Sequence, residues 1–209
     1  MGRFLILLPL LVFAVLPLPG WASGLFGMIE IQMDRIESIP KWVRALERIR
    51  AENMFGLCKR GDCPAKRDAW YAELAEWRGM SAEEQMVRVN RWVNRFDYIT
   101  DDDNWGMSDY WETPGEFIQR SGDCEDYAIL KYYTLRALGW PESALRMVVV
   151  HDAVRDIPHA VLAVELEGQN YILDNLATEP LRDEYVRQYT PYYAVNARSR
   201  WVFVKPARR

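Results

Sequence analysis

Residues 122–138 read GDCEDYAILKYYTLRAL, and this stretch organises the chain. Cys124 begins a long apolar helix, which Gly139 ends and Pro141 prevents from continuing. Downstream of this helix, β-branched runs alternate with turn residues and predict several antiparallel strands. Helices followed by such strands predict a single domain of the α+β class, with a helical N-terminal half packed on an antiparallel sheet.

Upstream of residue 122 the pattern is helical. Apolar residues recur at three- and four-residue steps from Ile29 to Arg50, which predicts an amphipathic helix interrupted near Pro40. A second helix is expected from Pro64, and Ser81 opens a third with a capping box. The stretch from Thr100 to Asp109 is predicted to be a polar loop.

The first 22 residues have the pattern of a secretory signal peptide. Arg3 precedes a short apolar run, and the small-residue site Gly20-Trp21-Ala22 follows it. The run is shorter than the roughly 20 residues that a membrane span needs, although a retained anchor is the alternative. We expect residues 1–22 to be removed by cleavage after Ala22, or after Gly24, and residues 23–209 to form one domain in the periplasm.

Composition excludes some functions. Apolar residues make up 50% of the chain and charged residues 27%, which are values of a globular protein. The net charge of −4 becomes about −5 without Arg3, so a nucleic-acid partner is not expected. Nine Trp and eleven Tyr predict a large aromatic core, with a peptide-binding groove as the alternative use of these side chains.

The three cysteines suggest chemistry, because an exported protein usually pairs its thiols. Cys58 and Cys63 are close enough in sequence for a local disulfide, which leaves Cys124 unpaired. Its place in the first turn of a helix favours the thiolate, the form that acts as a nucleophile. The backbone amide of Cys124 would also point outward, where it can bind an oxyanion.

Only two histidines are available as a base for this thiol. Pairing of the strands about a turn at Glu167-Gly168 puts position 161 opposite 174, so that His159 and Asp174 share one face of the hairpin as diagonal neighbours. A register slipped by one residue would separate them. We therefore predict Cys124 as nucleophile, His159 as base and Asp174 as the acid that orients the ring. His151, next to Asp152, is the alternative base.

Each of the predicted catalytic residues also has a simpler structural explanation. A helix-capping Asp beside a structural cysteine accounts for Gly-Asp-Cys, and a strand histidine beside a hairpin aspartate is an ordinary hydrogen-bonded pair. The joint occurrence of all three residues in this order is the argument for a catalytic set. The whole set of motifs resembles the bacterial transglutaminase-like cysteine proteinases: SGDCEDYA at 121–128, HAVL at 159–162 and LDN at 173–175, with WETPGEF at 111–117 upstream.

This resemblance covers roughly residues 85–204 and implies a papain/transglutaminase-like fold. The family includes calcium-dependent periplasmic Lap-type proteases, so it also implies a Ca²⁺ site formed by Asp123, Glu125 and Asp126. These three carboxylates would otherwise raise the pKa of the neighbouring thiol, and a bound Ca²⁺ would cancel their charge. The acidic loop 101–112 partly matches a calcium-binding loop, but Trp105 stands at a ligand position, and a ligand lent from this loop to the Cys124 site is the better alternative.

The resemblance further implies an activity and partners. We expect a calcium-dependent periplasmic cysteine endopeptidase that cleaves the N-terminal region of a large surface adhesin after small residues and so disperses biofilm. An inner-membrane cyclic-di-GMP receptor would sequester the enzyme. The alternatives are a transglutaminase-like acyltransferase or amidase acting on another peptide, and a catalytically inactive binding module.

Overall fold

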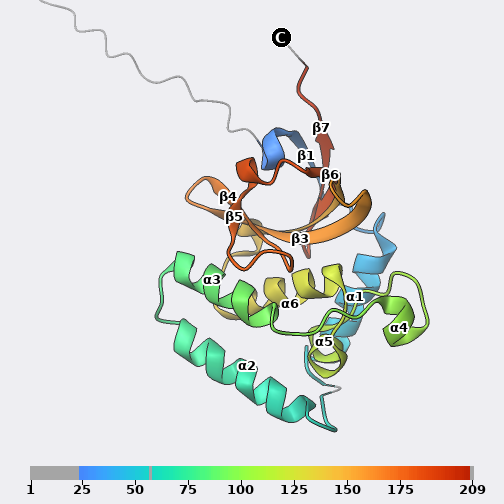
Figure 1. The fold of residues 1–209 in the computed structure, drawn as a ribbon, viewed down its shortest axis with the longest axis vertical. Helices are drawn as coiled ribbons and strands as arrows, with labels where there is room; N and C mark the ends of the chain where they lie inside the picture. The colour runs from blue at the N-terminus through green and yellow to red at the C-terminus, as the bar shows by residue number, and fades with distance from the viewer. Residues whose placement is uncertain (1–23, 57, 208–209) are drawn as a thin grey trace, which may run out of the picture.

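The computed structural model describes residues 24–56 and 58–207, which form helices on one side of a curved antiparallel sheet (Figure 1). The helices are α1 (Pro40–Ala51), α2 (Cys63–Trp77), α3 (Ala82–Val93), α4 (Asp101–Trp105), α5 (Pro114–Arg120) and α6 (Cys124–Ala137). The strands are β1 (Ile29–Met33), β2 (Leu145–Asp152), β3 (Ile157–Leu166), β4 (Gln169–Leu173), β5 (Leu181–Arg182), β6 (Tyr189–Val195) and β7 (Arg200–Val204). The α+β prediction is confirmed. The predicted signal peptide, residues 1–22, lies outside the described residues.

The sheet has the strand order β1-β7-β6-β2-β3-β4-β5. β1 corrects the predicted helix from Ile29 to Arg50, because residues Ile29–Met33 are extended and pair with β7, and the helix begins only at Pro40. Its residues alternate between apolar and polar, which is the strand period. The prediction of a polar loop after Thr100 is also corrected in part, because this stretch contains the short helix α4, capped by the Thr100 side chain.

The β3–β4 hairpin has the predicted register. Glu167 and Gly168 have φ angles of 51° and 75°, and two consecutive positive φ values are typical of the type I′ turn that joins twisted antiparallel strands. Leu162 pairs with Leu173, and the same register continues to position 161 opposite 174. The turn therefore fixes the relative placement of the two strand ends that carry His159 and Asp174.

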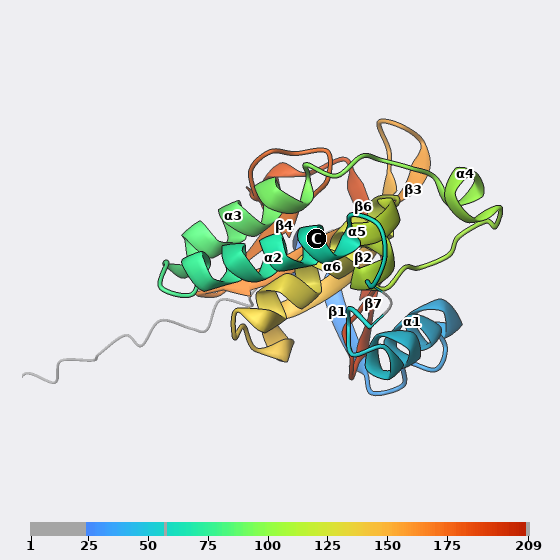
Figure 2. The ribbon, with the colours of Figure 1, turned by 90° about the horizontal axis from the view of Figure 1, so that it is seen from below.

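Helix α6 is at the centre of the molecule. It packs against β2 and β3 on one side and against α3 and α5 on the other, so most of its side chains are buried (Figure 2). The aromatic core is confirmed by Trp42, Trp70 and Trp77, all fully buried in the cluster around α6. In the part of the chain that the structure describes, no helix has the length and apolar character that crossing a membrane requires.

The predicted disulfide between Cys58 and Cys63 is present, at the start of α2. Cys124 is the free cysteine of the chain. The bond ties the segment before α2 to the first turn of that helix, next to α5, where the Cys63 sulfur lies 3.9 Å from the carbonyl oxygen of Gly115. The disulfide is thus a structural feature on the helical layer, and it leaves one thiol for chemistry.

Candidate active site

Cys124 is the first residue of α6, and local contacts place it there. Asp123 is the N-cap residue, and its backbone N–H donates to Oδ2 of Asp126 at 3.1 Å. A Cβ at position 122 would lie 2.3 Å from the same carboxylate oxygen, so only glycine fits beside this capping contact. The backbone of Gly122 also forms a parallel bridge to Tyr98. These contacts hold the thiol at the helix N-terminus, where partial positive charge favours an anion.

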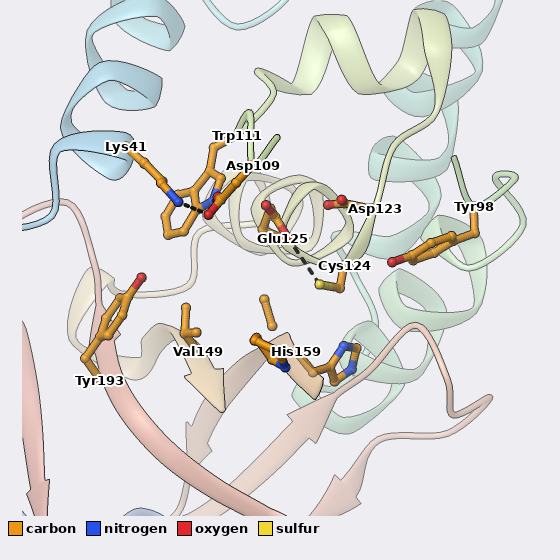
Figure 3. A pocket seen from close by; sticks show the side chains of 12 residues that line it. Lys41, Tyr98, Asp109, Trp111, Asp123, Cys124, Glu125, Val149, His159 and Tyr193 are labelled. Atoms are coloured by element: carbon orange, nitrogen blue, oxygen red, sulfur yellow. Dashed lines mark hydrogen bonds and ion pairs between the residues drawn. The ribbon is translucent and has the colours of Figure 1, made fainter. Parts of the chain in front are cut away.

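Cys124 and His159 line the same pocket (Figure 3). The cysteine comes from the helical layer, and the histidine comes from β3 in the sheet below it. The backbone N–H of Ala160, next to His159, lowers the pKa of the Cys124 thiol, although burial outweighs this effect. The other lining residues are Tyr98, Lys41, Asp109 and Trp111 on the walls, and Val149, Pro158, Ala160 and Tyr193 on the sheet, together with Asp123 and Glu125.

His159 is hydrogen-bonded to Asp174, with Nε2 2.9 Å from Oδ1, and both side chains are buried. This contact uses Nε2, so Nδ1 is the ring nitrogen left to receive a proton from a thiol. Oδ1 also accepts the Leu176 N–H at 3.0 Å, and Oδ2 accepts the Tyr189 hydroxyl at 2.5 Å. Burial raises the pKa of Asp174, but the hydrogen bonds and the charge of His159 outweigh it and keep this pKa below its usual value.

The structure thus brings the three predicted residues to one place, and it separates them from the alternative base. His151 lies against Asp156, with 3.4 Å between Nε2 and Oδ1; the His151 side chain is partly exposed and that of Asp156 is exposed. It does not belong to the lining of the Cys124 pocket. Tyr189 was not predicted, since nothing in its sequence surroundings on β6 marks it as a partner of Asp174. Its role in holding Asp174 is visible only from the fold.

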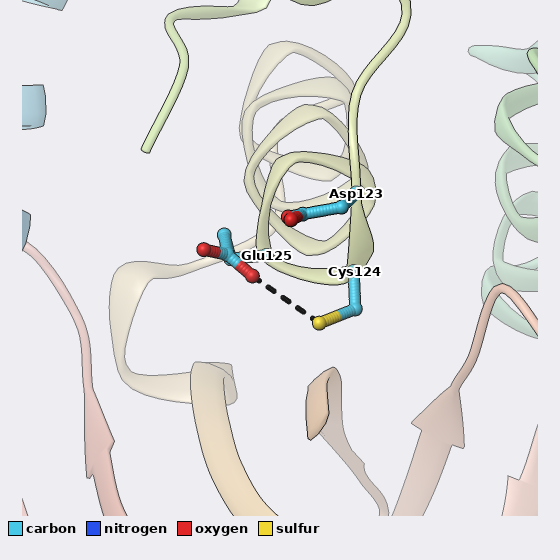
Figure 4. Close-up of side chains that lie close together, drawn as sticks. All are labelled: Asp123, Cys124 and Glu125. Atoms are coloured by element: carbon cyan, nitrogen blue, oxygen red, sulfur yellow. Dashed lines mark hydrogen bonds between the residues drawn. The ribbon is translucent and has the colours of Figure 1, made fainter. Parts of the chain in front are cut away.

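The surroundings of the Cys124 thiol oppose its ionisation. Burial raises the pKa of Cys124 well above its usual value, and the charges of Glu125 and Asp123 raise it further. The thiol donates a hydrogen bond to Oε2 of Glu125, at 3.2 Å (Figure 4). Burial and the acidic neighbours therefore both oppose the thiolate, which is the conflict that the sequence predicts.

A cluster of buried carboxylates lies behind the thiol. Oxygen atoms of Asp101, Asp123 and Asp126 are within 4.8 Å of one another. Glu112 is fully buried beside them, and its backbone N–H donates to Oδ1 of Asp126 at 2.7 Å. One oxygen each of Asp101, Glu112 and Asp123 has no hydrogen-bond partner among the described residues. Buried charges need such partners, so this cluster has the composition of a site for a cation.

The pKa values of these groups lead to the same conclusion. Burial and the neighbouring Glu125 charge raise the pKa of Asp123 to about 9. Burial raises the pKa of Glu112 to about 8, with further contributions from Glu116 and other carboxylates. Burial also raises the pKa of Asp126 strongly, and repulsion from Glu112 adds to it. The oxygen ligands fit Ca²⁺, which binds carboxylates without a strict geometry.

The residues of this acidic cluster are not the same three residues that the family resemblance implies as Ca²⁺ ligands. Asp123 and Asp126 are together, but their third partner is Asp101 of α4, the kind of ligand lent from the acidic loop that the sequence left open. Glu125 instead faces the thiol and forms a separate group with Asp123 and Cys124. Asp101 is buried and accepts the backbone N–H of Tyr110, which closes the 101–112 loop, and the Glu112 N–H joins this loop to Asp126 of α6.

Comparison with known proteins agrees with this site. Residues 54–208 match the family model described as bacterial transglutaminase-like cysteine proteinase. A structure of Legionella pneumophila LapG is 33% identical, with a TM-score of 0.64, and covers 72% of this chain and 86% of LapG. An EGTA-treated form of LapG has the same identity and TM-score, and a calcium-bound form is 30% identical, with a TM-score of 0.63, over 77% of this chain and 86% of that one. Among curated proteins, none has significant similarity to the chain.

The fold and these comparisons define a cysteine protease with transglutaminase-like architecture. The chain belongs to the bacterial transglutaminase-like cysteine proteinases, as the sequence motifs predicted, and it is a LapG-like protease.

Proposed function

We propose that this protein is a calcium-dependent cysteine endopeptidase with Cys124, His159 and Asp174 as its catalytic residues. The observation that carries the proposal is the buried hydrogen bond of 2.9 Å between His159 and Asp174, in the pocket that also contains the free thiol at the start of α6. A nucleophile, a base and a group that orients the base are the parts that covalent peptide hydrolysis needs.

The geometry supports the following sequence of steps. Nδ1 of His159 takes the proton of the Cys124 thiol, and the sulfur attacks the scissile carbonyl carbon. The backbone N–H of Cys124, free at the first turn of α6, donates to the oxyanion that forms. His159 then gives its proton to the leaving amine, and the C–N bond breaks to leave a thioester. Water, deprotonated by His159, attacks the thioester, and the acid product leaves while the sulfur recovers a proton.

Asp174 keeps His159 in place during these steps. Its Oδ1 accepts the Nε2–H, and its carboxylate stays ionised because its pKa lies below the usual value. Tyr189 holds the other carboxylate oxygen. Asp174 is therefore suited to stabilise the imidazolium without taking the proton itself.

Asp101, Asp123 and Asp126 would hold the calcium ion, with Glu112 beside them. When bound, Ca²⁺ would supply positive charge next to the thiol, where the neighbouring side chains in the sequence are carboxylates. Glu125 belongs to the ligand set implied by the family, and in this structure it accepts a hydrogen bond from the Cys124 thiol. The residues present fit the ion, because one buried oxygen each of Asp101, Asp123 and Glu112 has no hydrogen-bond partner among the described residues.

From the family resemblance we propose a periplasmic location and, as substrate, the N-terminal region of a large surface adhesin, cut after small residues. Release of that adhesin would disperse biofilm, and an inner-membrane cyclic-di-GMP receptor would sequester the enzyme. LapG, whose structures include a calcium-bound and an EGTA-treated form, supports the calcium part of this proposal.

The test is to incubate the purified protein with adhesin N-terminal regions from the same organism, in Ca²⁺ and in EGTA, and to map the fragments by mass spectrometry. Cleavage in Ca²⁺ alone that is lost in Cys124→Ala would support the proposal. Cleavage that persists in Cys124→Ala would rule out the thiol. Products joined to an added amine would instead indicate acyl transfer, and unchanged cellular function of Cys124→Ala would indicate a binding module.

A further inference from the structure

One row of apolar side chains crosses four strands of the sheet. Val149 of β2 pairs with Tyr193 of β6, Tyr193 pairs with Val202 of β7, and Val202 pairs with Ile31 of β1. Directly opposed residues of antiparallel strands lie side by side on the same face of a sheet. Val149, Tyr193, Val202 and Ile31 therefore form one continuous line, which we call the apolar row.

The row begins inside the catalytic pocket. Val149 and Tyr193 line the pocket that holds Cys124 and His159 (Figure 3). From there the row leads to β1, which is the last strand at that end of the sheet in the part of the chain that the structure describes. Figure 1 shows that β1 and β7 reach past the helices at this end of the sheet. The apolar floor of the pocket thus continues onto open surface.

The outer half of the row is solvent-exposed. Ile31 is 45% exposed, and the neighbouring pair of Ile29 and Val204 is 50% and 45% exposed. Val149, Tyr193 and Val202 are half-buried. A contiguous group of exposed apolar side chains is uncommon on a protein surface without a binding role. The carboxylates of Asp109, Asp123 and Glu125 are on the walls of the pocket together with the rings of Tyr98 and Trp111, and the sheet supplies its aliphatic contacts.

The length of the row fits a peptide in extended form. Three strand spacings of about 4.8 Å separate β2 from β1, or about 14 Å in all. An extended chain advances about 3.4 Å per residue, so about four residues cover this distance. A peptide whose scissile bond lies at Cys124 would therefore place residues about four to six positions away over Val202 and Ile31.

We infer that the apolar row is an extended subsite that binds an apolar stretch of the protein substrate, about four to six residues from the scissile bond. The inference rests on the proposed endopeptidase function. Continuity with the pocket selects this occupant, because a chain lying on Ile31 and Val202 and following the row arrives at the thiol. Binding of a second copy of the protein or of a regulatory partner to the row is a separate outcome that the experiment distinguishes.

The experiment compares two substrates with surface variants of the enzyme. The substrates are the cleaved adhesin N-terminal region and a hexapeptide that spans only its cut site. In Ile31→Gln and Val202→Gln we expect KM for the long substrate to rise about tenfold, the effect of losing one buried apolar side chain, while kinetics on the hexapeptide change less than twofold. Leu181→Gln is the matched control, since Leu181 is 40% exposed on β5 at the opposite edge of the sheet.

A second arm changes the substrate. Gln replaces its apolar residues four to six positions from the cut, on each side in turn. The replacement on one side should raise KM of the unsubstituted enzyme about tenfold and have no further effect in Ile31→Gln, because the two changes remove the same contact. Additive effects would overturn the inference. Melting temperatures of the variants, expected within about 2 °C of the unsubstituted protein, check that folding is intact.

The remaining outcomes of these experiments also test the subsite. A KM for the long substrate within twofold of normal in Ile31→Gln overturns the subsite. Loss of self-association or of receptor binding with an unchanged KM also overturns it and assigns the row to that partner. If the unsubstituted enzyme cleaves neither substrate, the endopeptidase proposal itself fails, and the subsite fails with it.

Discussion

Adding Ca²⁺ to the metal-free protein at pH 7 should release about two protons per ion from Asp123 and Glu112, besides any from Asp126, because buried carboxyls next to the metal must ionise when it binds. The acidic cluster provides the protons. The pKa of Asp123 is about 9 and that of Glu112 is about 8, both raised chiefly by burial. At pH 7 a carboxyl with a pKa of about 9 is about 99% protonated, and one with a pKa of about 8 is about 90% protonated.

The release should depend on pH in a defined direction. The protons are present in the metal-free state below these pKa values and absent above them, so the release should fall toward zero by about pH 10. Below about pH 8, where Asp123 and Glu112 are both protonated, each unit of rising pH should improve the apparent Kd at least about 100-fold. Calcium at 100 times its Kd would add about 2.7 kcal/mol to the free energy of unfolding, so EGTA should lower the melting temperature.

Isothermal titration calorimetry measures the proton number. The observed binding enthalpy in Tris and in Pipes differs by the number of protons released times the difference in buffer ionisation enthalpy. Asp101→Asn should weaken binding by removing a ligand, while Asp102→Asn, an exposed neighbour on α4, should bind normally. Equal enthalpies in the two buffers at pH 7 would refute the assignment of raised pKa values to a calcium site.

Three further outcomes test the site. Cys124 should react with iodoacetamide at pH 6 faster than free cysteine in Ca²⁺, and at least about tenfold more slowly in EGTA, since burial and the neighbouring Glu125 raise the thiol pKa and the ion would offset them; equal rates with and without EGTA would show that it does not. Asp174→Asn should lower kcat by about 10² to 10⁴ at an unchanged melting temperature, and near-normal turnover would assign the orienting role elsewhere. Burial lowers the pKa of the Lys131 amine from 10.5 to about 7, so between these pH values the unfolded chain binds more protons than the folded one, and the free energy of unfolding should rise with pH. Lys131→Met should abolish this rise in denaturant titrations at several pH values. The same rise with pH in the variant would contradict the argument.

Some features could be predicted because they depend on nearby residues. The type I′ turn at Glu167-Gly168 sets the register of β3 and β4, and the two-residue period then places His159 beside Asp174. The capping box at Ser81 and the disulfide between Cys58 and Cys63 are local in the same sense. In each case the interacting groups are a few residues apart or are joined by one tight turn.

Other features depend on residues that meet only in the folded chain. The alternation of Ile29–Met33 fits a strand, but the segment runs into the helical pattern that follows, and its partner β7 is at the other end of the sequence. Tyr189 reaches Asp174 from β6, and Asp101 joins Asp123 and Asp126 from α4. No local pattern reports such contacts, because each depends on how separate elements pack.

The sequence by itself determined the chemistry of this protein: a thiol at a helix start, a histidine and an aspartate on one hairpin, and too many carboxylates around the sulfur. Helix capping and strand register act over a few residues, and the order of residues encodes them directly. The tertiary structure decided how far the thiol pKa is raised and which carboxylates lie together in the acidic cluster. Burial sets both, and burial is a property of the packed molecule.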